Sequence, residues 1–357
     1  MSAPRKRIPV AVLGATGAVG QAFVRLLAEH PWFELAELAA SERSAGKKYG
    51  EAARWLTGAL DPDIARMPVL ECDPKRVQSP IVFSALDAAA AAEVEAAFAH
   101  AGRFVLSNAR SYRMEPDVPL LIPEVNAEHL ALVEVQRKRR KWDGAIATNP
   151  NCAATVVAMA LAPLHAAFGV RQCFVTTLQA VSGAGYPGVA SLDILGNAIP
   201  FIGGGEEEKI ETETPKMLGT FAAGAVTAAP IAMSAQVTRV AVEHGHTVCL
   251  SVALEKRATP DAAIAALEKW KGSIHGMGLP SAPERALVVT RDESRPQPRR
   301  DVDAGGGMTV TVGRVRSDPL LDHRLLALGH NSVRGAAGPS ILNADLAVHR
   351  EHALPSS

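Results

Sequence analysis

The feature that most constrains the fold is an apolar run leading directly into a glycine-rich turn near the start of the chain. Residues 8–13 form the run, and Gly14-Ala15-Thr16-Gly17-Ala18-Val19-Gly20 follows it. Short continuous apolar runs are typical of strands buried in a parallel sheet, and helical periodicity then extends over 17–29. Glycines between a strand and a helix allow a tight turn and a close approach of the backbone to a pyrophosphate. The pattern favours a dinucleotide-binding loop over the alternative, a purely structural turn.

Strands and helices alternate through the rest of the first 148 residues. The apolar patterns predict strands at 33–40, 81–85, 104–107 and 145–148, and helices at 87–100, with Asp87 as N-cap, and 127–139. Such alternation implies a parallel sheet with right-handed crossovers and helices on both faces. We therefore predict an α/β protein whose residues 1–148 form a doubly wound, Rossmann-type domain that binds a dinucleotide.

The second half of the chain has a different character. Its strand-like segments are rich in Val and Thr and lie at 173–181, 246–254, 286–290 and 308–315, while helices are predicted at 189–195, 206–218 and 260–270. This mixture indicates an α+β catalytic and dimerisation domain over 149–331, built on a mostly antiparallel sheet. Residues 294–307 form a loop rich in Pro, Arg and Gly. A last helix at about 336–349, within 332–357, is expected to pack back on the first domain.

Composition excludes several classes of function. Lys and Arg together number 37, as do Asp and Glu, and only 4% of residues are aromatic, so nothing favours nucleic acid or an anionic membrane. The four cysteines form no Cys-x-x-Cys pair, which argues against zinc and against a disulfide framework. The apolar stretch 153–170 is interrupted by Pro163 and His165 and is too short to span a bilayer. We expect a cytoplasmic protein with a small-molecule substrate and no metal, nucleic-acid or membrane partner.

The loop after the second strand bears on which dinucleotide is bound. Glu42 alone would indicate a ribose 2′-hydroxyl and hence NAD. Ser41, Arg43 and Lys47 are three potential donors that suit a 2′-phosphate. We therefore predict NADP as the cofactor, the alternative being that these are ordinary polar loop residues.

A candidate nucleophile, Cys152, closes the run Asn149-Pro150-Asn151-Cys152. The run follows the last strand of the first domain, and an apolar helix over 153–161 begins at once. A cysteine at a helix N-terminus is expected to have a lowered pKa, because the helix dipole stabilises the thiolate. The N–H groups of the first turn, together with Asn151, are candidates for an oxyanion hole.

A thiolate nucleophile needs a partner that moves protons. The segment 239–246 places Arg239, His244 and His246 just before a strand. His246 is the candidate to take the thiol proton and later assist acyl transfer, and Arg239 can hold a carboxylate bidentately. Two histidines around a glycine can also indicate a metal, but no third ligand is evident.

Two further segments carry candidate anion-binding groups. Glu206 and Lys209 lie three residues apart on one helical face and can serve one substrate, Glu206 on an amine and Lys209 on a phosphate. Arg113, in a loop with Asn108, is another candidate for the phosphate. The alternative for the acidic residues is that they only stabilise a helix start.

Taken in order, these segments resemble a known family. The matching pieces run nearly end to end: GATGAVG from Gly14, SERSAGK from Ser41, NPNC at Asn149, QAVSGAGYPG at Gln179, GEEEKIETET from Gly205, RVAVEHGHT at Arg239 and HNSVRGAAG at His330. The chain resembles the aspartate-semialdehyde dehydrogenases and looks closest to their archaeal and fungal branch. One departure is Ala153, where relatives commonly have Ser or Thr; its missing hydroxyl removes one possible hydrogen bond near the thiolate.

The resemblance implies a role for each candidate. Cys152 would be the nucleophile, His246 the acid/base group and Gln179 a residue that orients the acyl-enzyme. The substrate-binding set would be Arg239 on the α-carboxylate, Glu206 on the amino group, Arg113 and Lys209 on the phosphate, and Asn108 nearby. The cofactor-binding set would be Gly14, Thr16, Gly17, Ala18, Val19, Ser41, Arg43, Ser44, Ser84, Ser182, Gly183 and Asn331, the last three around the nicotinamide.

The resemblance also implies the reaction. It is the reduction of L-aspartyl 4-phosphate by NADPH to L-aspartate 4-semialdehyde and phosphate, through a Cys152 thioester, in the route to lysine, threonine and methionine. A homodimer or homotetramer through the sheet of the second domain is expected. The nearest alternative is a malonyl-CoA reductase, which applies the same chemistry to a CoA thioester. A nucleotide sensor without catalysis is a third possibility, although it would need none of Cys152, Gln179, Arg239 and His246.

Overall fold

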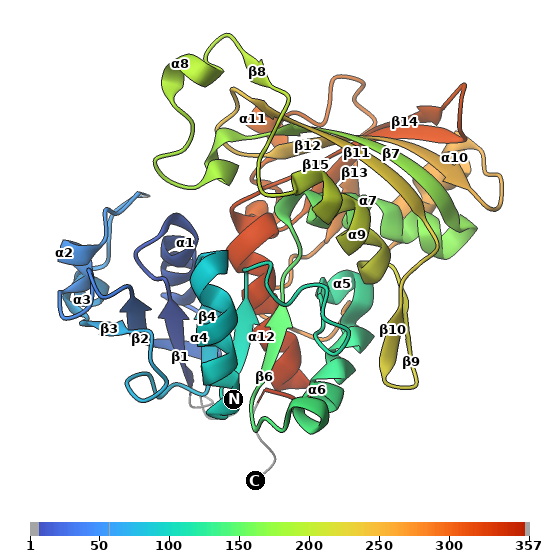
Figure 1. Cartoon of the computed structure of the whole chain (residues 1–357). Coiled ribbons are helices and arrows are strands. Elements are labelled where there is room, and N and C mark those ends of the chain that lie inside the picture. The colour runs from blue at the N-terminus through green and yellow to red at the C-terminus, as the bar shows by residue number, and fades with distance from the viewer. Residues whose placement is uncertain (1–6, 57, 354–357) are drawn as a thin grey trace, which may run out of the picture.

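Two β-sheets, one in each half of the chain, organise the molecule (Figure 1). The structure, a computed structural model, describes residues 7–56 and 58–353. Residues 1–6 of the predicted first domain, and 354–357 of the C-terminal segment 332–357 that is expected to pack on it, lie outside the described residues. Apart from the sheets and their main helices, the described chain contains short elements: α2 (Tyr49–Ala52), α3 (Pro62–Arg66), α5 (Pro123–Asn126), η1 (Ala127–Ala131), η2 (Val181–Ala184), β9 (Thr220–Ala222), β10 (Ala225–Thr227), α11 (Pro298–Asp301) and η3 (Ala304–Gly307).

The first sheet has six parallel strands in the order β3-β2-β1-β4-β5-β6. The strands are β1 (Ile8–Leu13), β2 (Phe33–Ala40), β3 (Val69–Glu71), β4 (Ile81–Ser84), β5 (Phe104–Ser107) and β6 (Ala145–Thr148). The order reverses between β1 and β4, which is where doubly wound sheets bind nucleotides. The predicted Rossmann-type sheet is thus confirmed. Of its strands only β3 was not predicted, because three residues are too short to display a strand period.

Helices cover both faces of the first sheet. On one face, α1 (Ala18–Leu27) and α12 (Gly338–His349) pack against the even-numbered side chains of β1, Val10 and Val12. On the other face, α4 (Ala88–His100) packs against the odd-numbered ones, Ala11 and Leu13. Both sides of each central strand are therefore buried, which explains the unbroken apolar runs. A further helix, α6 (Leu132–Arg140), precedes β6, and the segment η4 (Val333–Ala337) leads into α12.

The second sheet has seven strands in the order β13-β14-β15-β12-β7-β11-β8. They are β7 (Val170–Gln179), β8 (Ala198–Ile199), β11 (Ala232–Val240), β12 (His246–Leu254), β13 (Leu287–Val289), β14 (Val310–Ser317) and β15 (His323–Gly329). Only the pairs β7·β11 and β13·β14 are parallel, so the prediction of a mostly antiparallel sheet is confirmed. Strands β11 and β15 were not predicted. Polar side chains such as Ser234 and Gln236 line one side of β11 and hide its alternation.

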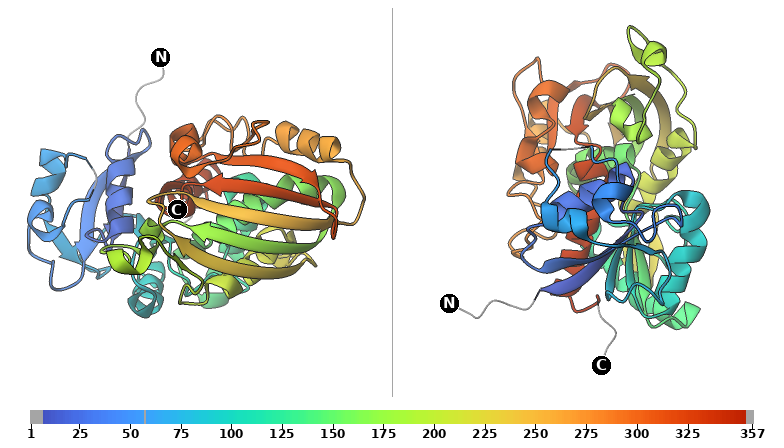
Figure 2. Two further views of the ribbon diagram at one scale, coloured as in Figure 1. Left: turned by 90° about the horizontal axis from the view of Figure 1, so that it is seen from above. Right: turned by 90° about the vertical axis from the view of Figure 1, so that its left-hand side faces the viewer.

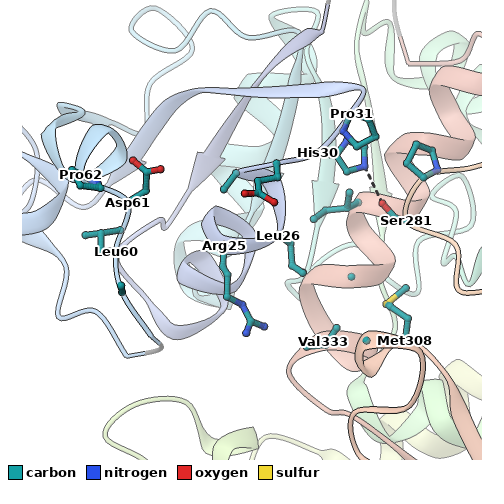
Figure 3. A pocket seen from close by; sticks show the side chains of 17 residues that line it. Arg25, Leu26, His30, Pro31, Leu60, Asp61, Pro62, Ser281, Met308 and Val333 are labelled. Carbon is teal, nitrogen blue, oxygen red and sulfur yellow. Dashed lines mark hydrogen bonds between the residues drawn. The ribbon is translucent and has the colours of Figure 1, made fainter.

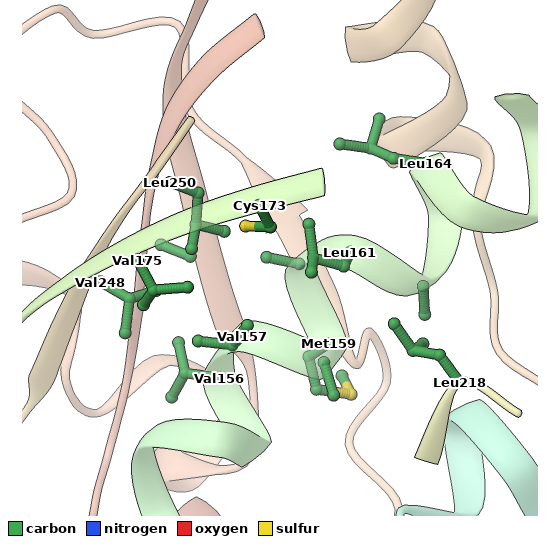
Figure 4. Packing of buried hydrophobic residues seen from close by; sticks show 14 of the residues in the cluster. Val156, Val157, Met159, Leu161, Leu164, Cys173, Val175, Leu218, Val248 and Leu250 are labelled. Atoms are coloured by element: carbon green, nitrogen blue, oxygen red, sulfur yellow. The ribbon is translucent and has the colours of Figure 1, made fainter. Parts of the chain in front are cut away.

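One face of the second sheet is covered by helices, and the other is open (Figure 2). The covering helices are α7 (Cys152–Phe168), α9 (Glu206–Met217) and α10 (Pro260–Lys269). Figure 4 shows the core between α7 and the sheet, where Val157 and Leu161 lie opposite Val175 and Leu250. On the open face Phe174 is 58% exposed and Leu178 is 40% exposed. Large apolar side chains in this position mark a surface that is suited to a protein contact.

Helix lengths differ from prediction at two places. α7 continues to Phe168 instead of ending at about 161, because its buried face extends through Pro163 and Leu164. The helix expected at 189–195 is reduced to α8 (Ser191–Ile194), in a segment where Leu192 and Leu195 are exposed. Asp87 does stand at the N-cap of α4, but its side chain makes no capping hydrogen bond. In the described part of the chain, no helix is long and apolar enough to cross a membrane.

Candidate active site

The glycine-rich loop joins β1 to α1 and leaves room for a ligand. Gly14 has φ of +71°, and a Cβ there would lie 2.5 Å from the Ala85 carbonyl oxygen. A Cβ on Gly20 would strike the Gly14 carbonyl oxygen, so this glycine allows α1 to pack closely on the turn. Gly17, in contrast, is exposed at the N-cap of α1, with only one protein atom at ordinary contact distance. The loop therefore fits a pyrophosphate above the helix N-terminus, next to Thr16, Ala18 and Val19.

The residues predicted to bind the rest of the dinucleotide come from both domains. Four lie at this edge of the first sheet, Ser41, Arg43, Ser44 and Ser84, and three come from the second domain, Ser182, Gly183 and Asn331. Ser41 and Arg43 are exposed, and Ser44 half-buried, in the turn directly after β2. Ser84, however, is fully buried at the end of β4, and its carbonyl oxygen accepts from the Asn108 backbone N–H. Its side chain is therefore enclosed by protein, and the part of Ser84 in cofactor binding stays a prediction.

Cys152 is the first residue of α7, and Asn151 caps that helix. The Asn151 Oδ1 atom accepts hydrogen bonds from the backbone N–H groups of Ala153 (2.9 Å) and Ala154 (3.1 Å). These two N–H groups are already paired, so an oxyanion hole in the first turn of the helix would need the N–H of Cys152 itself or a change of partners, and it stays a prediction. Asn151 Nδ2 in turn donates to the Glu206 carboxylate at 2.9 Å, so the cap also ties α7 to α9.

His246 lies beside the nucleophile although 94 residues separate the two in sequence. Its Nε2 atom is 3.2 Å from Cys152 Sγ, and its Nδ1 atom accepts the backbone N–H of Ala180 at 3.1 Å. A neutral imidazole that accepts at Nδ1 carries its proton on Nε2. In this geometry His246 faces Sγ as a donor. The prediction that it takes the thiol proton therefore requires the ring to give up its bond to Ala180.

Arg239 stands on the other side of Ala180. Its Nη1 atom donates to the Ala180 carbonyl oxygen at 2.8 Å, so one residue's backbone holds both Arg239 and His246. Gly183 lies against the same pair, because a Cβ there would be 2.8 Å from Arg239 Nη1 and 3.0 Å from His246 Cε1. Burial, followed by the positive charges of Arg239 and His330, lowers the pKa of His246 to about 3. The ring is therefore neutral at physiological pH.

The thiol is also uncharged in the free protein, so the predicted lowering of its pKa is wrong. Cys152 is half-buried at the cavity wall, and the loss of solvent around Sγ, together with the Glu206 carboxylate, raises the pKa of Cys152 to about 12. Arg113, the Ala153 N–H and Arg239 act in the opposite direction but are outweighed. The helix N-terminus, taken alone, predicted a lowered pKa. Burial and the Glu206 carboxylate reverse the direction of the Cys152 pKa shift, and no local pattern in the sequence reveals either of them.

This reversal makes the reactivity of Cys152 dependent on pH. In the free protein, alkylation of Cys152 by iodoacetamide should accelerate roughly tenfold per pH unit from about pH 7 to about pH 10, because the thiolate fraction keeps growing below a raised pKa. Mass spectrometry of the Cys152 peptide measures this rate separately from those of the other thiols. A plateau below about pH 8 would show that the thiolate is already formed near neutrality.

A cavity of about 470 Å³ opens over Cys152 between the two domains. α9 contributes Glu206 and Lys209, whose charges pair at 2.8 Å between Oε1 and Nζ. The predicted residues that line the same cavity are Ala18, Val19, Asn108, Arg113, Cys152, Ser182, Gly183, Glu206, Lys209 and Asn331. The structure therefore brings nucleophile, anion-binding cations and part of the cofactor loop to one place. A concave site with convergent polar groups of this kind suits a small charged substrate.

Arg113 is held at the cavity wall by two hydrogen bonds. Its Nη1 atom pairs with Glu213 Oε1 at 2.9 Å, and its Nη2 atom donates to the Asn108 carbonyl oxygen at 2.7 Å. The Asn108 side chain is itself tied down, since its Oδ1 accepts from Asn149 Nδ2 at 3.0 Å and its Nδ2 donates to Ser340 Oγ at 3.2 Å. The phosphate candidates of the first domain are thus placed by groups that come from α9 and α12.

The remaining predicted residues lie around this cavity. Ser182 Oγ accepts from Asn331 Nδ2 at 2.8 Å and lies 2.9 Å from His244 Nδ1. Gln179 is buried at the end of β7, in register with Arg239, and its amide donates to Thr177 Oγ1 at 3.3 Å. Gln179 therefore directly precedes Ala180, whose N–H bonds His246, and it does not line the cavity.

Ala153, the departure from the family pattern, points into the core. It is fully buried in the cluster between α7 and the second sheet and does not line the cavity. A hydroxyl in that position would need a buried partner. The alanine therefore removes no group from the cavity wall.

Two residues of the site were not predicted from the sequence. Glu213 bridges Arg113 and the backbone of Asn151, and Gly335 allows close packing, because a Cβ there would lie 2.5 Å from Cys152 Cβ. Glu213 lies in a helical run of charged residues, and nothing in the sequence distinguishes it from the other acidic residues of that run. Gly335 belongs to the HNSVRGAAG motif, but no local signal connects it to a cysteine so far away in sequence.

A second cavity, of about 670 Å³, lies at the far end of α1 and shares no residue with the first (Figure 3). It contains His30, whose Nε2 atom is 3.1 Å from Ser281 Oγ and 3.4 Å from Asp345 Oδ1. This is not a nucleophilic triad, because in a triad the acid and the serine bond opposite ring nitrogens. Here Nδ1 accepts backbone N–H groups of Trp32 and Phe33. No cluster of three or more possible metal ligands occurs within 7–56 and 58–353.

Comparisons with known proteins agree with this architecture. A family model described as "Semialdehyde dehydrogenase, NAD binding domain" matches residues 9–133, and one described as "Semialdehyde dehydrogenase, dimerisation domain" matches 161–334. The aspartate-semialdehyde dehydrogenase of Archaeoglobus fulgidus is 52% identical over 96% of this chain and 98% of its own length, and that of Schizosaccharomyces pombe 47% identical over 96% and 98%. The crystal structure of the Candida albicans enzyme with NADP covers 97% of this chain and all of its own, with a TM-score of 0.90 and 40% identity.

Proposed function

This chain belongs to the aspartate-semialdehyde dehydrogenase family, and we propose that the cavity over Cys152 is its active site. The enzyme reduces L-aspartyl 4-phosphate to L-aspartate 4-semialdehyde and phosphate with NADPH, a reaction of lysine, threonine and methionine biosynthesis. The observation that carries the site is the 3.2 Å contact between Cys152 Sγ and His246 Nε2, within reach of Glu206, Arg113 and Lys209. The relatives in archaea and fungi do not favour the malonyl-CoA alternative.

The first step is acyl transfer to the thiol. Cys152 Sγ forms a bond to the acyl carbon while the carbon–oxygen bond to phosphate breaks, and the thiol proton leaves on the phosphate, so that a thioester and hydrogen phosphate result. Arg113 and Lys209 bind the phosphate oxygens, and Lys209 exchanges its present partner Glu206 for them. Glu206 is then available for the substrate ammonium. The positive charge of the ammonium would offset the charge of Glu206, which raises the pKa of the Cys152 thiol.

The second step is reduction of the thioester. Bound NADPH supplies the hydride. His246 carries a proton on Nε2, so it is placed to relay one proton from solvent, first to the oxygen of the resulting thiohemiacetal and then to Sγ as the carbon–sulfur bond breaks, so that the aldehyde and the Cys152 thiol result. Arg239 binds the α-carboxylate and, through the Ala180 carbonyl oxygen, holds the backbone that fixes the His246 ring.

NADP is the cofactor, and Arg43 is proposed to bind its 2′-phosphate. Replacing Arg43 by alanine should raise KM for NADPH by ~10-fold or more and leave KM for NADH unchanged, because a charge-assisted hydrogen bond is worth about 1.5–3 kcal/mol. Lys138→Ala, which removes an exposed cation from α6, is the matched control and should change neither constant. An unchanged KM for NADPH in the Arg43 variant would remove Arg43 from the cofactor site.

One pair of assays tests the proposed reaction. Aspartate semialdehyde with NADP⁺ should yield NADPH only when phosphate is present, since phosphate must release the acyl group from Cys152. Malonyl-CoA with NADPH is the comparison and should not be consumed. If malonyl-CoA is consumed and the semialdehyde shows no phosphate-dependent reaction, the protein is a malonyl-CoA reductase instead.

The second domain matches a dimerisation domain, which indicates that the chain forms an oligomer. We propose a homodimer or homotetramer in which the open face of the second sheet, with Phe174 and Leu178, forms the contact. Light scattering on the purified protein distinguishes these states from a monomer. A cytoplasmic location stays a prediction, which fractionation of the host cell tests.

A further inference from the structure

A buried carboxylate behind the cavity joins the anion-binding loop to the nucleophile. Glu213 Oε1 pairs with Arg113 Nη1 at 2.9 Å, and Glu213 Oε2 accepts the backbone N–H of Asn151 at 2.6 Å. The Glu213 side chain is only 2% exposed. Each carboxylate oxygen thus holds a different segment, one from the loop after β5 and one from the residue directly before Cys152.

Arg113 depends on Glu213 for its orientation. Its other hydrogen bond is to the Asn108 carbonyl oxygen, while its buried Nε atom has no partner among the residues the structure describes. A guanidinium held by two bonds loses its fixed direction when one of them is removed. Without Glu213, Arg113 would remain in the cavity wall but would no longer be aimed at one point.

The same helix also fixes the backbone of the Arg113 loop. Lys216, one turn after Glu213 on α9, donates from Nζ to the carbonyl oxygens of Arg113 (2.6 Å), Glu115 (2.8 Å) and Val118 (3.1 Å). α9 also carries Glu206 and Lys209 into the cavity. One helix therefore sets the relative positions of all the proposed phosphate-binding and amine-binding groups.

Stability alone gives little reason for such a buried ion pair. Removing two charges from water costs about as much as their attraction returns, and apolar replacements of similar volume are often as stable. A pair that bonds two separate parts of an active site is better explained by the geometry that it imposes.

We propose that Glu213 is a positioning residue that aligns Arg113 with Cys152, so that the phosphate and the acyl carbon are presented together to Sγ. This rests on the proposed function. Glu213 touches neither substrate nor cofactor and acts through Arg113 Nη1 and the Asn151 N–H. Loss of the alignment should weaken the handling of phosphate selectively, because Arg239 and the glycine-rich loop are held by other groups.

The test is Glu213→Gln in the full-length enzyme, assayed with aspartate semialdehyde, NADP⁺ and phosphate. A glutamine can accept only one of the two donors that face it, so one contact is lost with little change in volume. KM for phosphate should rise ~10-fold or more and kcat should fall, while KM for aspartate semialdehyde and for NADP⁺ stay within about twofold. Glu208→Gln, an exposed acid on the same helix, is the matched control and should behave as the wild type.

A double variant separates positioning from general damage. In an Arg113→Ala background, Glu213→Gln should add little further change in KM for phosphate, since residues that act through one contact are not additive. The proposal would be overturned by any of three results. The effects of the two substitutions on KM for phosphate could multiply in the double variant, KM for phosphate could stay unchanged in Glu213→Gln, or kcat could fall in Glu213→Gln with all KM values unchanged. If Glu213→Gln does not fold, Glu213→Asp, too short to span both partners, gives the same readout. Absence of phosphate-dependent activity in the wild type would instead contradict the proposed function.

Discussion

Replacing Cys152 by alanine is expected to abolish the phosphate-dependent reduction of NADP⁺ while NADPH binding is retained. Among the described residues no other thiol lines the cavity, and without Sγ no thioester forms, so kcat should fall by ~10⁴-fold or more. The fold should persist, because Asn151 caps α7 with its own side chain and alanine keeps the Cβ against which Gly335 packs. The glycine-rich loop belongs to the first sheet and is unaffected.

The measurement combines steady-state turnover with NADPH titration by fluorescence. Cys249→Ala is the matched control, because Cys249 is a half-buried thiol on β12, the strand that begins with His246. This control should retain full turnover. Turnover within tenfold of the wild type in the Cys152 variant would exclude covalent catalysis at this residue.

Replacing His246 by alanine is expected to lower kcat by ~10²-fold or more with little change in the affinity for NADPH. The variant lacks the Nε2 proton next to Sγ and the group that bonds Ala180 N–H. His246→Gln offers a finer comparison. Its side-chain amide can donate a hydrogen bond but cannot transfer a proton, so a rate close to that of the alanine variant assigns the loss to proton transfer.

His275→Ala, which removes an exposed imidazole, is the control for loss of a histidine and should leave kcat unchanged. The pH profile provides a second check. Because the pKa of His246 is lowered to about 3, its ring is neutral at every pH above that value, and kcat/KM should show no inflection from this ring between about pH 5 and 8. A kcat in His246→Ala equal to that of the wild type would remove His246 from the mechanism.

Several features of the fold followed from local patterns. Five of the six parallel strands were predicted, because each contains a short run of mainly apolar residues that is buried in the sheet. The glycine-rich turn was recognised from its position between a strand and a helix. The structure shows why glycine is needed there, because a Cβ on Gly14 would strike the Ala85 carbonyl oxygen and a Cβ on Gly20 would strike the Gly14 carbonyl oxygen. β11 was missed because one of its faces is polar and hides the alternation. β15 was missed although most of its side chains are apolar and buried.

Part of the candidate site was grouped from the sequence, but Glu213 and Gly335 were missed and the electrostatics were not predicted. The order of the motifs alone was enough to group Cys152, His246, Arg239 and Glu206 into one site. The direction of the thiol pKa was wrong, and two N–H groups of the first turn, those of Ala153 and Ala154, are already paired with Asn151. A helix N-terminus is a local feature, but the burial of Sγ and the approach of Glu206 depend on α9, which is remote from Cys152 in sequence.

Three features follow from the amino-acid sequence alone: the strand–turn–helix that receives the dinucleotide, the helix start that presents Cys152, and the family to which the chain belongs. They depend on residues adjacent in the chain, through backbone angles, apolar periodicity and capping. Only the packed fold establishes on which ring nitrogen His246 carries its proton. It also establishes that Glu213 connects Arg113 to the residue before Cys152. Protonation and ion pairing depend on burial and on the distances between groups far apart in sequence, and those distances exist only once the two sheets have packed.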